Sequence, residues 1–353
     1  MTRRAFVVWL LGLLAWGAAL VVGFLELMER MGRSSRLLDG GARSQAADGA
    51  RAEQREPRQE AEAVPLFAFM VLSDLHISKH DPGTIRHLKQ ALTDIEQMDT
   101  RVGAIALTGD LTEYGTDEEY GELRKLLAAY KLPPVYANMG NHDYYHVWLD
   151  RSGQFNPKTM PHGKTDWQSR ERFQQFFGLK KPYHDAWVNG HHLIALSQET
   201  YVQERPEVGE GAWYSEEQLR WLEQQLAPHK DGSPVFILTH QPLPPAGQDG
   251  KSHQLIPAQR LRAILKPYKN VFVFCGHRHQ DFAGKGEHYV KEGFHYFHNS
   301  SVGRVLNEKY EHVAKEKAQG MYVEVFADRV RLRGREFASR KWVKEADWTV
   351  PFA

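Results

Sequence analysis

The sequence predicts an α/β fold built around one large domain. From Leu66 onward, short apolar runs alternate with amphipathic stretches, which is the pattern of strands separated by crossover helices. The last two apolar runs have no helix between them, which indicates that part of the sheet structure is antiparallel. The chain has 353 residues, 42% of them hydrophobic and 25% charged, and this composition is enough to bury a sizeable core.

Residues 1–30 are expected to form a membrane anchor. After Arg3 and Arg4, residues 5–25 carry no charge, and about 21 helical residues extend roughly 31 Å, enough to cross the hydrocarbon core of a bilayer. The alternative is a cleaved signal peptide, although the apolar core of such a peptide is normally shorter.

The orientation of this anchor is nearly balanced under the positive-inside rule, because Arg30, Arg33 and Arg36 follow the apolar run. However, the start Thr2-Arg3-Arg4-Ala5-Phe6 resembles the twin-arginine export signal, in which paired arginines precede an apolar run. We therefore expect a membrane-anchored protein whose main domain lies outside the cytoplasm.

Residues 31–64 are predicted to form a flexible linker, because they are rich in Gly, Ala, Gln, Arg and Glu and poor in large apolar residues. The formal net charge of +1 argues against the basic track that holds long nucleic acids. A single cysteine, Cys275, excludes an internal disulfide framework. It follows Val-Phe-Val-Phe and is expected to be a buried strand thiol.

Eight apolar runs and two helix-start signals define the elements of the main domain, residues 65–353. Thr116 and Ser215 are each followed three residues later by Glu or Gln, as in a capping box, which predicts helices over 117–130 and 216–226. Ala327-Asp328 is expected to be a hairpin turn. The predicted strands are 67–72, 104–107, 135–137, 193–196, 235–238, 271–274, 322–326 and 330–333.

Five of these runs are followed directly by polar residues of the same kinds. Ligands of open α/β sheets gather beyond the carboxyl ends of strands, so we expect the five segments to converge on one site. Carboxylate, amide oxygen and imidazole together suit divalent ions such as Mn, Fe or Zn. The segments are Asp74-Leu75-His76, Gly109-Asp110, Gly140-Asn141-His142-Asp143, His240 and Gly276-His277-Arg278-His279.

In this order, the five segments resemble the motifs of the calcineurin-like metallophosphoesterase superfamily. Within the superfamily they are similar to the branch that includes bacterial cyclic-nucleotide phosphodiesterases. The resemblance covers about Phe67 to His279, with every motif present. It implies a four-layer α/β/β/α sandwich with mixed sheets over residues 65–353, and a metal-dependent phosphoric ester hydrolase.

The resemblance also implies the roles of individual residues. Two divalent metal ions, Mn, Fe or Zn, would lie about 3.5–4 Å apart with Asp110 between them, and a bridging water would act as hydroxide toward phosphorus. His142 matches the position beside the leaving group, where an imidazole donates a proton. The implied ligands are Asp74, His76 and His279 for one ion, and Asn141, His240 and His277 for the other.

Two carboxylates near these ligands are expected to have other roles. The run from Gly109 to Gly115 lacks the arginine that the Ser/Thr protein phosphatases of this superfamily carry, which argues against a protein phosphatase. Glu113 in this run could orient His142, or it could be a surface or loop-capping carboxylate. Asp143 is expected to support the site rather than to bind metal.

Four further features border the motifs. Residues 144–167 are too long for an ordinary connection and predict a loop or cap near the site, whose aromatics either pack onto the body or stack on a base or lipid. Residues 241–254 are expected to form a wall of the pocket. Arg278 either contacts a substrate oxygen or points away. His191 and His192 are expected to be structural.

The expected function is that of a phosphodiesterase or phosphatase acting on a small or lipid-linked phosphate ester. A nuclease or a nucleotide or lipid pyrophosphatase of the same superfamily is the first alternative, and the nearly neutral charge argues against the nuclease. The second is a non-catalytic, membrane-tethered binding protein with this fold, against which the complete set of ligand residues argues.

Overall fold

The computed structural model of the chain describes residues 64–353. The predicted membrane anchor, and all but the last residue of the predicted linker, lie outside the described residues. Between residues 64 and 353, no helix combines the length and the hydropathy that crossing a membrane requires.

Six strands form sheet one, in the order β12 (Lys341–Pro351), β11 (Arg329–Glu336), β10 (Gln319–Val325), β1 (Phe67–Leu72), β2 (Ala104–Thr108) and β3 (Val135–Asn138). Strands β1, β2 and β3 are parallel, whereas β10, β11 and β12 add to them as antiparallel strands. In the central β1–β10 pair, Phe67 lies opposite Val325 and Val71 lies opposite Met321. The first strand of the domain therefore pairs in the middle of this sheet with β10, the first of the three C-terminal strands.

Sheet two also has six strands, in the order β4 (His184–Val188), β5 (His191–Ala195), β6 (Val235–Leu238), β7 (Val271–Cys275), β9 (His295–His298) and β8 (Tyr289–Lys291). The four inner strands are parallel, and the edge strands β4 and β8 are antiparallel to their neighbours. The predicted α/β fold is thus confirmed, with two mixed sheets.

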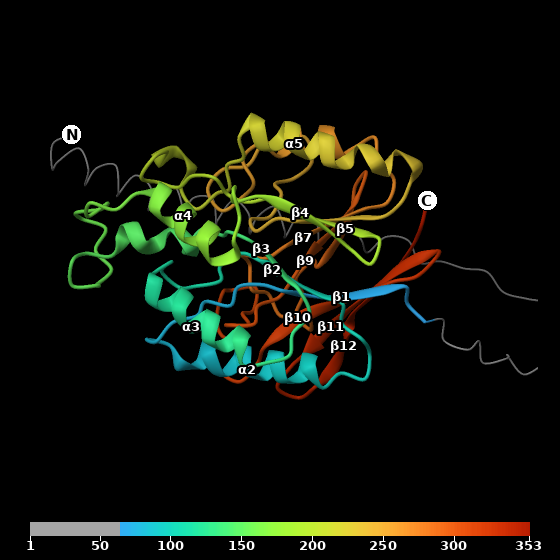
Figure 1. Cartoon of the computed structure of the whole chain (residues 1–353), viewed down its shortest axis with the longest axis horizontal. Coiled ribbons are helices and arrows are strands. Elements are labelled where there is room, and N and C mark those ends of the chain that lie inside the picture. Colours follow the sequence, from blue (N-terminus) through green and yellow to red (C-terminus); the bar gives the residue numbers. More distant parts are fainter. Residues whose placement is uncertain (1–63) are drawn as a thin grey trace, which may run out of the picture. The chain divides into compact units, whose positions relative to one another are not determined.

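Helices cover the outer faces of the two sheets (Figure 1). The helices are α2 (Pro82–Glu96), α3 (Asp117–Ala128), α4 (Asp166–Phe177), α5 (Glu216–Leu226) and α6 (Ala258–Leu265), with short 3-10 segments η1 (His142–Trp148), η2 (Pro206–Val208) and η3 (Ala227–Asp231). Helices α2 and α3 lie against sheet one, and α5 and α6 pack against sheet two.

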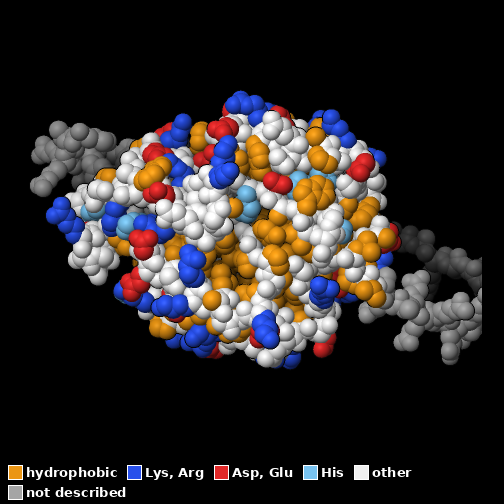
Figure 2. All heavy atoms as spheres, in the orientation of Figure 1, with side chains coloured by type: hydrophobic (Ala, Val, Ile, Leu, Met, Phe, Trp, Pro, Cys, Tyr) orange, Lys and Arg blue, Asp and Glu red, His pale blue; other side chains and the backbone are white. Residues whose placement is uncertain are grey.

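Three apolar layers hold these elements together, and β1 contributes to two of them. Met70 and Leu72 belong to the layer shared with α2 and α3, whereas Phe69 and Val71 belong to the layer between the sheets. Because side chains alternate along a strand, burial of both faces requires the continuous apolar run seen in the sequence. Figure 2 shows apolar side chains across the middle of the visible face, with Lys and Arg mainly toward its margins.

The predicted elements agree closely with the observed ones. Strands β1 and β6 and helix α5 have their predicted bounds, and β10 and β11 form the predicted hairpin around residues 327–328. Helix α3 ends at Ala128, two residues before its predicted end. Strand β5 begins at His191 rather than at residue 193, because His191 and His192 continue the pairing with β4.

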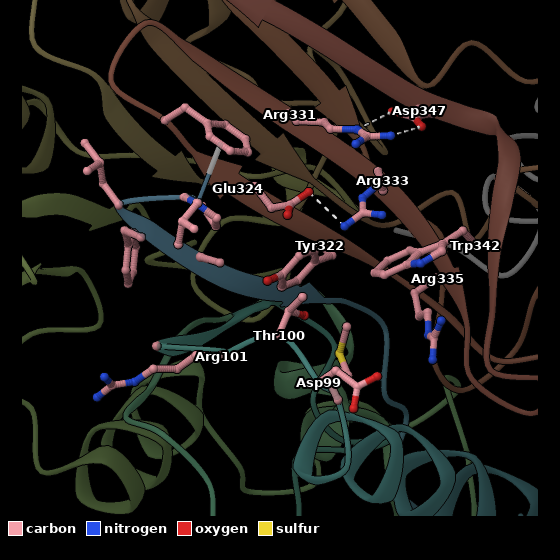
Figure 3. A pocket seen from close by; sticks show the side chains of 18 of the residues that line it. Asp99, Thr100, Arg101, Tyr322, Glu324, Arg331, Arg333, Arg335, Trp342 and Asp347 are labelled. Carbon is pink, nitrogen blue, oxygen red and sulfur yellow. Dashed lines mark hydrogen bonds and ion pairs between the residues drawn. The ribbon is translucent and has the colours of Figure 1, made fainter. Parts of the chain in front are cut away.

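A cavity of about 1170 Å³ opens at the start of β1, at the end opposite the loop that follows Leu72 (Figure 3). Arginines at alternate positions of β11 line this cavity. The guanidinium groups of three of them pair with carboxylates of neighbouring elements. The pairs are Arg331 with Asp347, Arg333 with Glu324 and Arg335 with Asp94, at N–O distances of 2.9, 2.9 and 2.7 Å. These pairs connect β11 to β12, β10 and α2, so the arginines hold the C-terminal strands in place.

Candidate metal centre

The structure brings the predicted ligand residues together at the carboxyl ends of strands from both sheets. They are Asp74 and His76 after β1, Asp110 after β2, Asn141 after β3, His240 after β6, and His277 and His279 after β7. The parallel strands of the two sheets end on the same side, so each loop delivers its polar side chain to one centre.

The backbone at this centre is strained. Five of the seven residues have φ between 48° and 70°, the left-handed region that non-glycine residues rarely adopt: Asp74, His76, Asp110, His277 and His279. Each such conformation costs about 1–3 kcal/mol and is typical of functional sites. Hydrogen bonds between the loops stabilise this backbone conformation. The Asp74 amide donates to the Gly109 carbonyl at 3.1 Å, and the His76 amide donates to the Asp110 carbonyl at 3.0 Å.

The first group of candidate ligands consists of Asp74, His76, Asp110 and His279, whose nearest donor atoms all lie within 4.8 Å of one another. The two imidazoles approach with their Nε2 atoms 3.0 Å apart. His279 Nε2 also lies 3.0 Å from Asp74 Oδ1, and His76 Nε2 lies 3.8 Å from Asp110 Oδ2. Two carboxylates and two imidazoles thus surround one small volume.

The second group shares Asp110 with the first and adds His240 and His277, again within 4.8 Å. His240 Nε2 lies 3.1 Å from Asp110 Oδ2. Asn141 joins this side of the centre, since its Oδ1 atom lies 3.1 Å from His277 Nδ1. Asp110 is therefore the one residue that belongs to both groups, as expected for a carboxylate between two ions.

The ligand atoms of this centre are arranged to bind a cation rather than to form hydrogen bonds with one another. His240 Nδ1 must donate to the Thr108 carbonyl, 2.7 Å away, because a carbonyl only accepts. In the neutral ring, Nε2 then presents a lone pair toward the Asp110 carboxylate, and this buried atom has no hydrogen-bond partner. A lone pair and a carboxylate at 3.1 Å repel unless a proton or a metal ion lies between them.

In the absence of an ion, the Asp110 charge favours a proton at that position. Burial alone would lower the pKa of His240, but the Asp110 charge outweighs it and raises the pKa to about 9. Burial opposes ionisation of Asp74 as well, yet the neighbouring His279 and His240 imidazoles lower its pKa to about 2. The metal-free centre therefore carries both carboxylate charge and exchangeable protons. Metal binding would release these protons.

His142 lies at the edge of this centre, with its side chain 20% exposed. Its backbone amide donates to Asp110 Oδ1 at 2.9 Å, and its Nδ1 donates to the Glu113 carbonyl at 3.0 Å. The ring also packs edge-on against the His76 ring, with centroids 4.5 Å apart. Because Nδ1 is engaged, Nε2 is the nitrogen left for a substrate.

Glu113, which was expected either to orient His142 or to be a surface or loop-capping carboxylate, contacts both His76 and His142. Its carboxylate accepts from His76 Nδ1 at 3.0 Å and pairs with Arg304 at 2.9 Å, while lying 3.9 Å from His142 Nδ1. The carboxylate thus orients a candidate ligand and lies within ion-pair distance of His142, while the backbone carbonyl of Glu113 accepts from the His142 ring. Burial would raise the pKa of Glu113, but the bond to His76 and the nearby charges lower it to about 2.

Arg304 and Glu210 are two neighbours of the centre that the sequence analysis missed. Arg304 follows β9, whose loop also joins the centre, since the Gly303 amide donates to the Asp74 carbonyl at 3.0 Å. The signal there is weak, because β9 has the sequence His-Tyr-Phe-His and is not an apolar run, although small polar residues follow it. Glu210 has no such signal, as it lies in a turn after η2.

Asp143 supports the loops, as predicted, and belongs to neither ligand group. Its carboxylate accepts from the amides of Gly140, Leu111 and Thr112 at 3.0–3.3 Å. These bonds join the loops after β2 and β3. Burial and the nearby Asp110 charge raise the pKa of Asp143 to about 6, although the amide bonds favour its ionised form.

The two segments expected to border the site lie beside it. In the first, Tyr144 is fully buried, and Trp148 donates from Nε1 to the Tyr201 hydroxyl at 3.0 Å, so these aromatics pack onto the body. In the second, Gln241 Nε2 lies 3.4 Å from Asn141 Oδ1, and His253 Nδ1 lies 3.2 Å from His277 Nε2. The segment of residues 241–254 therefore borders the centre through residues near both of its ends.

The remaining singled-out residues lie apart from the two ligand groups. His192 bonds through Nε2 to Asp185 at 2.9 Å and through Nδ1 to His229 at 2.9 Å, in a structural cluster beside β5. Cys275 is buried at the end of β7, as predicted. Its thiol accepts from the Tyr296 hydroxyl at 2.9 Å.

Bacterial phosphodiesterases are among the relatives of the chain. A "Probable cyclic nucleotide phosphodiesterase" of Rhodococcus erythropolis is 30% identical over 196 residues, 54% of this chain and 56% of the relative. A glycerophosphodiester phosphodiesterase of Enterobacter lignolyticus is 24% identical over 180 residues, 51% of this chain and 56% of the relative. A 3',5'-cyclic adenosine monophosphate phosphodiesterase of Haemophilus influenzae is 25% identical over 227 residues, 62% of this chain and 71% of the relative. The match thus spans just over half the length of the first two relatives.

Solved structures share the fold at low identity. A dimetal phosphatase from Danio rerio superposes with a TM-score of 0.58 at 14% identity, covering 82% of this chain and 100% of that structure. A purple acid phosphatase from yellow lupin gives a TM-score of 0.52 at 14% identity, covering 81% of this chain and 53% of that structure. A model of the calcineurin-like phosphoesterase family matches residues 67–281, which include every loop that carries a candidate ligand. The chain therefore belongs to the calcineurin-like phosphoesterase family.

Proposed function

We propose that the chain is a dinuclear metal-dependent phosphodiesterase that acts on a small or lipid-linked phosphodiester. One observation carries this proposal: two groups of candidate ligands share Asp110, and the imidazole of His142 packs against that of His76. The relatives named for phosphodiester substrates support the substrate class. Hydrolysis of phosphomonoesters is the second candidate, since the solved structures of similar fold include phosphatases.

In this proposal, two divalent ions are held by seven side chains. When bound, such ions polarise a phosphoryl group and acidify water near it. The three residues of the first site are Asp74, His76 and His279, those of the second are Asn141, His240 and His277, and Asp110 serves both. Imidazole and carboxylate ligands fit Mn, Fe or Zn equally.

The chain's own residues make the ions necessary for binding substrate. Burial of Asp74 and Asp110 opposes their ionisation, but the neighbouring imidazoles outweigh it and lower both pKa values, which favours the charged carboxylates. In the metal-free centre a protonated His240 offsets one of these two charges, and the remaining charge repels an anionic phosphodiester, so bound divalent cations are needed to reverse the local charge. Removal of metal should therefore abolish substrate binding as well as turnover.

His142 supplies the proton for the leaving group. Its Nδ1–H is committed to the Glu113 carbonyl, so a protonated ring carries its second proton on Nε2, on the open side of the centre. Transfer of that proton to the departing oxygen avoids the release of a free alkoxide. The bond from the His142 amide to Asp110 keeps this ring at a fixed place relative to the ligands.

A substrate screen tests the proposal. The full-length chain, purified in detergent and freed of metal by a chelator, is supplied with Mn²⁺, Fe²⁺ or Zn²⁺. It is then assayed on cyclic nucleotides, glycerophosphodiesters, phosphomonoesters, nucleotide pyrophosphates and phospholipid headgroups. Metal-dependent hydrolysis confined to phosphodiesters is expected. Activity on monoesters alone would favour the second candidate, and no hydrolysis of any class with any metal would refute both.

The proposal includes a membrane anchor over residues 1–30, a linker over 31–64 and a catalytic domain outside the cytoplasm. It is supported by the uncharged run of residues 5–25 and by the paired Arg3 and Arg4 before it. A reporter that works only outside the cytoplasm, fused to the C-terminus, should be active, and N-terminal sequencing of the mature protein should find residue 1 or 2. Silence from a well-expressed fusion would contradict export, and a start beyond residue 15 would indicate cleavage.

A further inference from the structure

Glu210 makes an unusual set of contacts beside the metal centre. It lies in the turn after η2, far from the centre along the chain, and is half-buried. Three groups donate to its carboxylate: Asn141 Nδ2 and the Tyr145 hydroxyl to Oε2, both at 2.9 Å, and the Tyr201 hydroxyl to Oε1 at 2.6 Å. Glu210 has no role in the proposed hydrolysis mechanism.

The first consequence of these contacts is the orientation of the Asn141 amide. A side-chain amide has a donating end and an accepting end, and only the accepting oxygen can ligate a metal. A carboxylate accepts but cannot donate, so Glu210 fixes Nδ2 toward itself. Oδ1 then faces the centre, 3.1 Å from His277 Nδ1. Gln241 Nε2, which donates to Oδ1 at 3.4 Å, and the Tyr145 hydroxyl, which accepts from Nδ2 at 3.3 Å, favour the same orientation, but both contacts are longer than the 2.9 Å bond to Glu210.

The second consequence concerns the ring of His142. The same Oε2 atom that holds Asn141 also accepts from the Tyr145 hydroxyl. The Tyr145 ring stacks on the His142 ring, with centroids 4.0 Å apart and an interplanar angle of 28°. One carboxylate oxygen thus connects a candidate metal ligand to the proton donor.

Separate hydrogen bonds hold the carboxylate of Glu210 and its backbone. Tyr201 accepts from Trp148 Nε1 at 3.0 Å and donates to Glu210, so its hydroxyl is fixed from two sides. The Glu210 amide donates to Ser252 Oγ at 3.3 Å, and its carbonyl accepts from Gln241 Nε2 at 3.1 Å. Loss of the carboxylate would therefore leave the turn's backbone contacts in place.

We infer that Glu210 is a positioning residue that turns the oxygen of Asn141 toward the metal centre and, through Tyr145, holds the ring of His142. This inference rests on the proposed function. Groups that orient metal ligands typically contribute 10–100-fold to metal affinity, and the effect here should be confined to the ion held by Asn141. The other ion, on the Asp74 side, should keep its affinity.

Metal titration of the metal-free, full-length chain tests the inference without relying on activity. Calorimetry with Mn²⁺ and with Zn²⁺ should detect two ions in the unmodified chain. Glu210→Ala should weaken one ion by about 10–100-fold and leave the other unchanged. Glu210→Gln retains one accepting oxygen and should give a smaller loss. The matched control is Glu207→Gln, an exposed carboxyl of the same segment, which should bind both ions normally.

A second variant separates the two consequences. Tyr145→Phe keeps the ring that stacks on His142 but removes its hydroxyl, and with it the bond to Glu210 and a 3.3 Å contact from Asn141 Nδ2, while the shorter bond from Asn141 to Glu210 remains. It should weaken ion binding much less than Glu210→Ala does and lose turnover several-fold. Thermal unfolding of each variant near the temperature of the unmodified chain would show that the fold is intact.

The outcomes are distinguishable from a failure of the proposed function. If the unmodified chain binds no ion, the proposed function is wrong and the inference falls with it. If it binds two ions and both folded Glu210 variants also bind two with unchanged affinity, only the inference is overturned. Equal weakening of both ions would likewise overturn it, because Glu210 contacts ligands of one site alone.

Discussion

Replacing His142 with alanine tests the division of labour between its backbone and its side chain. The bond to Asp110 comes from the backbone amide and survives the substitution, so the variant should still bind two metal ions. The imidazole, by contrast, is the group beside the centre with a free Nε2. A positioned general acid contributes about 10²–10⁴-fold, which corresponds to about 2.7–5.4 kcal/mol of transition-state stabilisation.

Leaving groups of different basicity provide the assay. A nitrophenolate leaves without help from a proton, whereas an alkoxide does not, so His142→Ala should slow hydrolysis of alkyl phosphodiesters far more than of nitrophenyl phosphodiesters. Metal content is measured on the same samples, and His80→Ala, at an exposed position, serves as the matched control. Unchanged turnover, or the same loss for both leaving groups, would refute the assignment of His142 as the acid.

Three other perturbations have outcomes that the structure fixes. Glu113→Ala removes the partner of a ligand imidazole and should lower metal affinity about 10–100-fold, as measured by equilibrium dialysis. In metal-free protein, the free energy of unfolding should fall by up to about 3 kcal/mol between pH 6.5 and 9, as measured by urea titrations. The reason is that the pKa of His240 is raised to about 9 in the folded state, so only the folded state keeps this proton over that pH range. The variant His240→Asn should not show this fall. Gly140→Ala would place a Cβ 2.2 Å from Asp110 Oδ1 and should abolish binding of both ions in calorimetric titrations, whereas Gly121→Ala, whose Cβ meets nothing within 4 Å, should bind them normally.

The fold could be predicted where burial leaves a continuous signal in the sequence. Both faces of β1 and β6 are buried, so their sequences are unbroken apolar runs with clear ends. Strand β12 was missed because charged residues and a register shift opposite Arg333 and Gly334 interrupt its pattern. The edge strands β4 and β8 are only partly buried and give little apolar signal.

Helix α4 shows a different kind of miss. Thr165 and Gln168 form a full capping box at its start, the same signal that correctly located α3 and resembles the start of α5. The preceding loop from residue 149 obscured it, since that segment has no periodic pattern. Helix α2 begins after Asp81 with a proline at its first position, which is also a recognised start signal.

The candidate site was predictable to the extent that strand ends define it. The seven candidate ligands follow predicted strands, so strand order alone brings them together. Arg304 and Glu210 reach the centre through side chains from segments whose position depends on tertiary packing. Nothing local in the sequence around Glu210 distinguishes it from the exposed carboxyls nearby.

The pairing of β1 with β10 has a consequence for how the protein is made. The first strand of the domain lies beside β10, so sheet one cannot close until residues 319–325 have been synthesised. Contacts this distant along the chain slow folding, and until they form, the edge of β1 is open to pairing with other chains. The segment matched by the family model ends before β10, so a chain ending there would expose the same edge permanently and should aggregate.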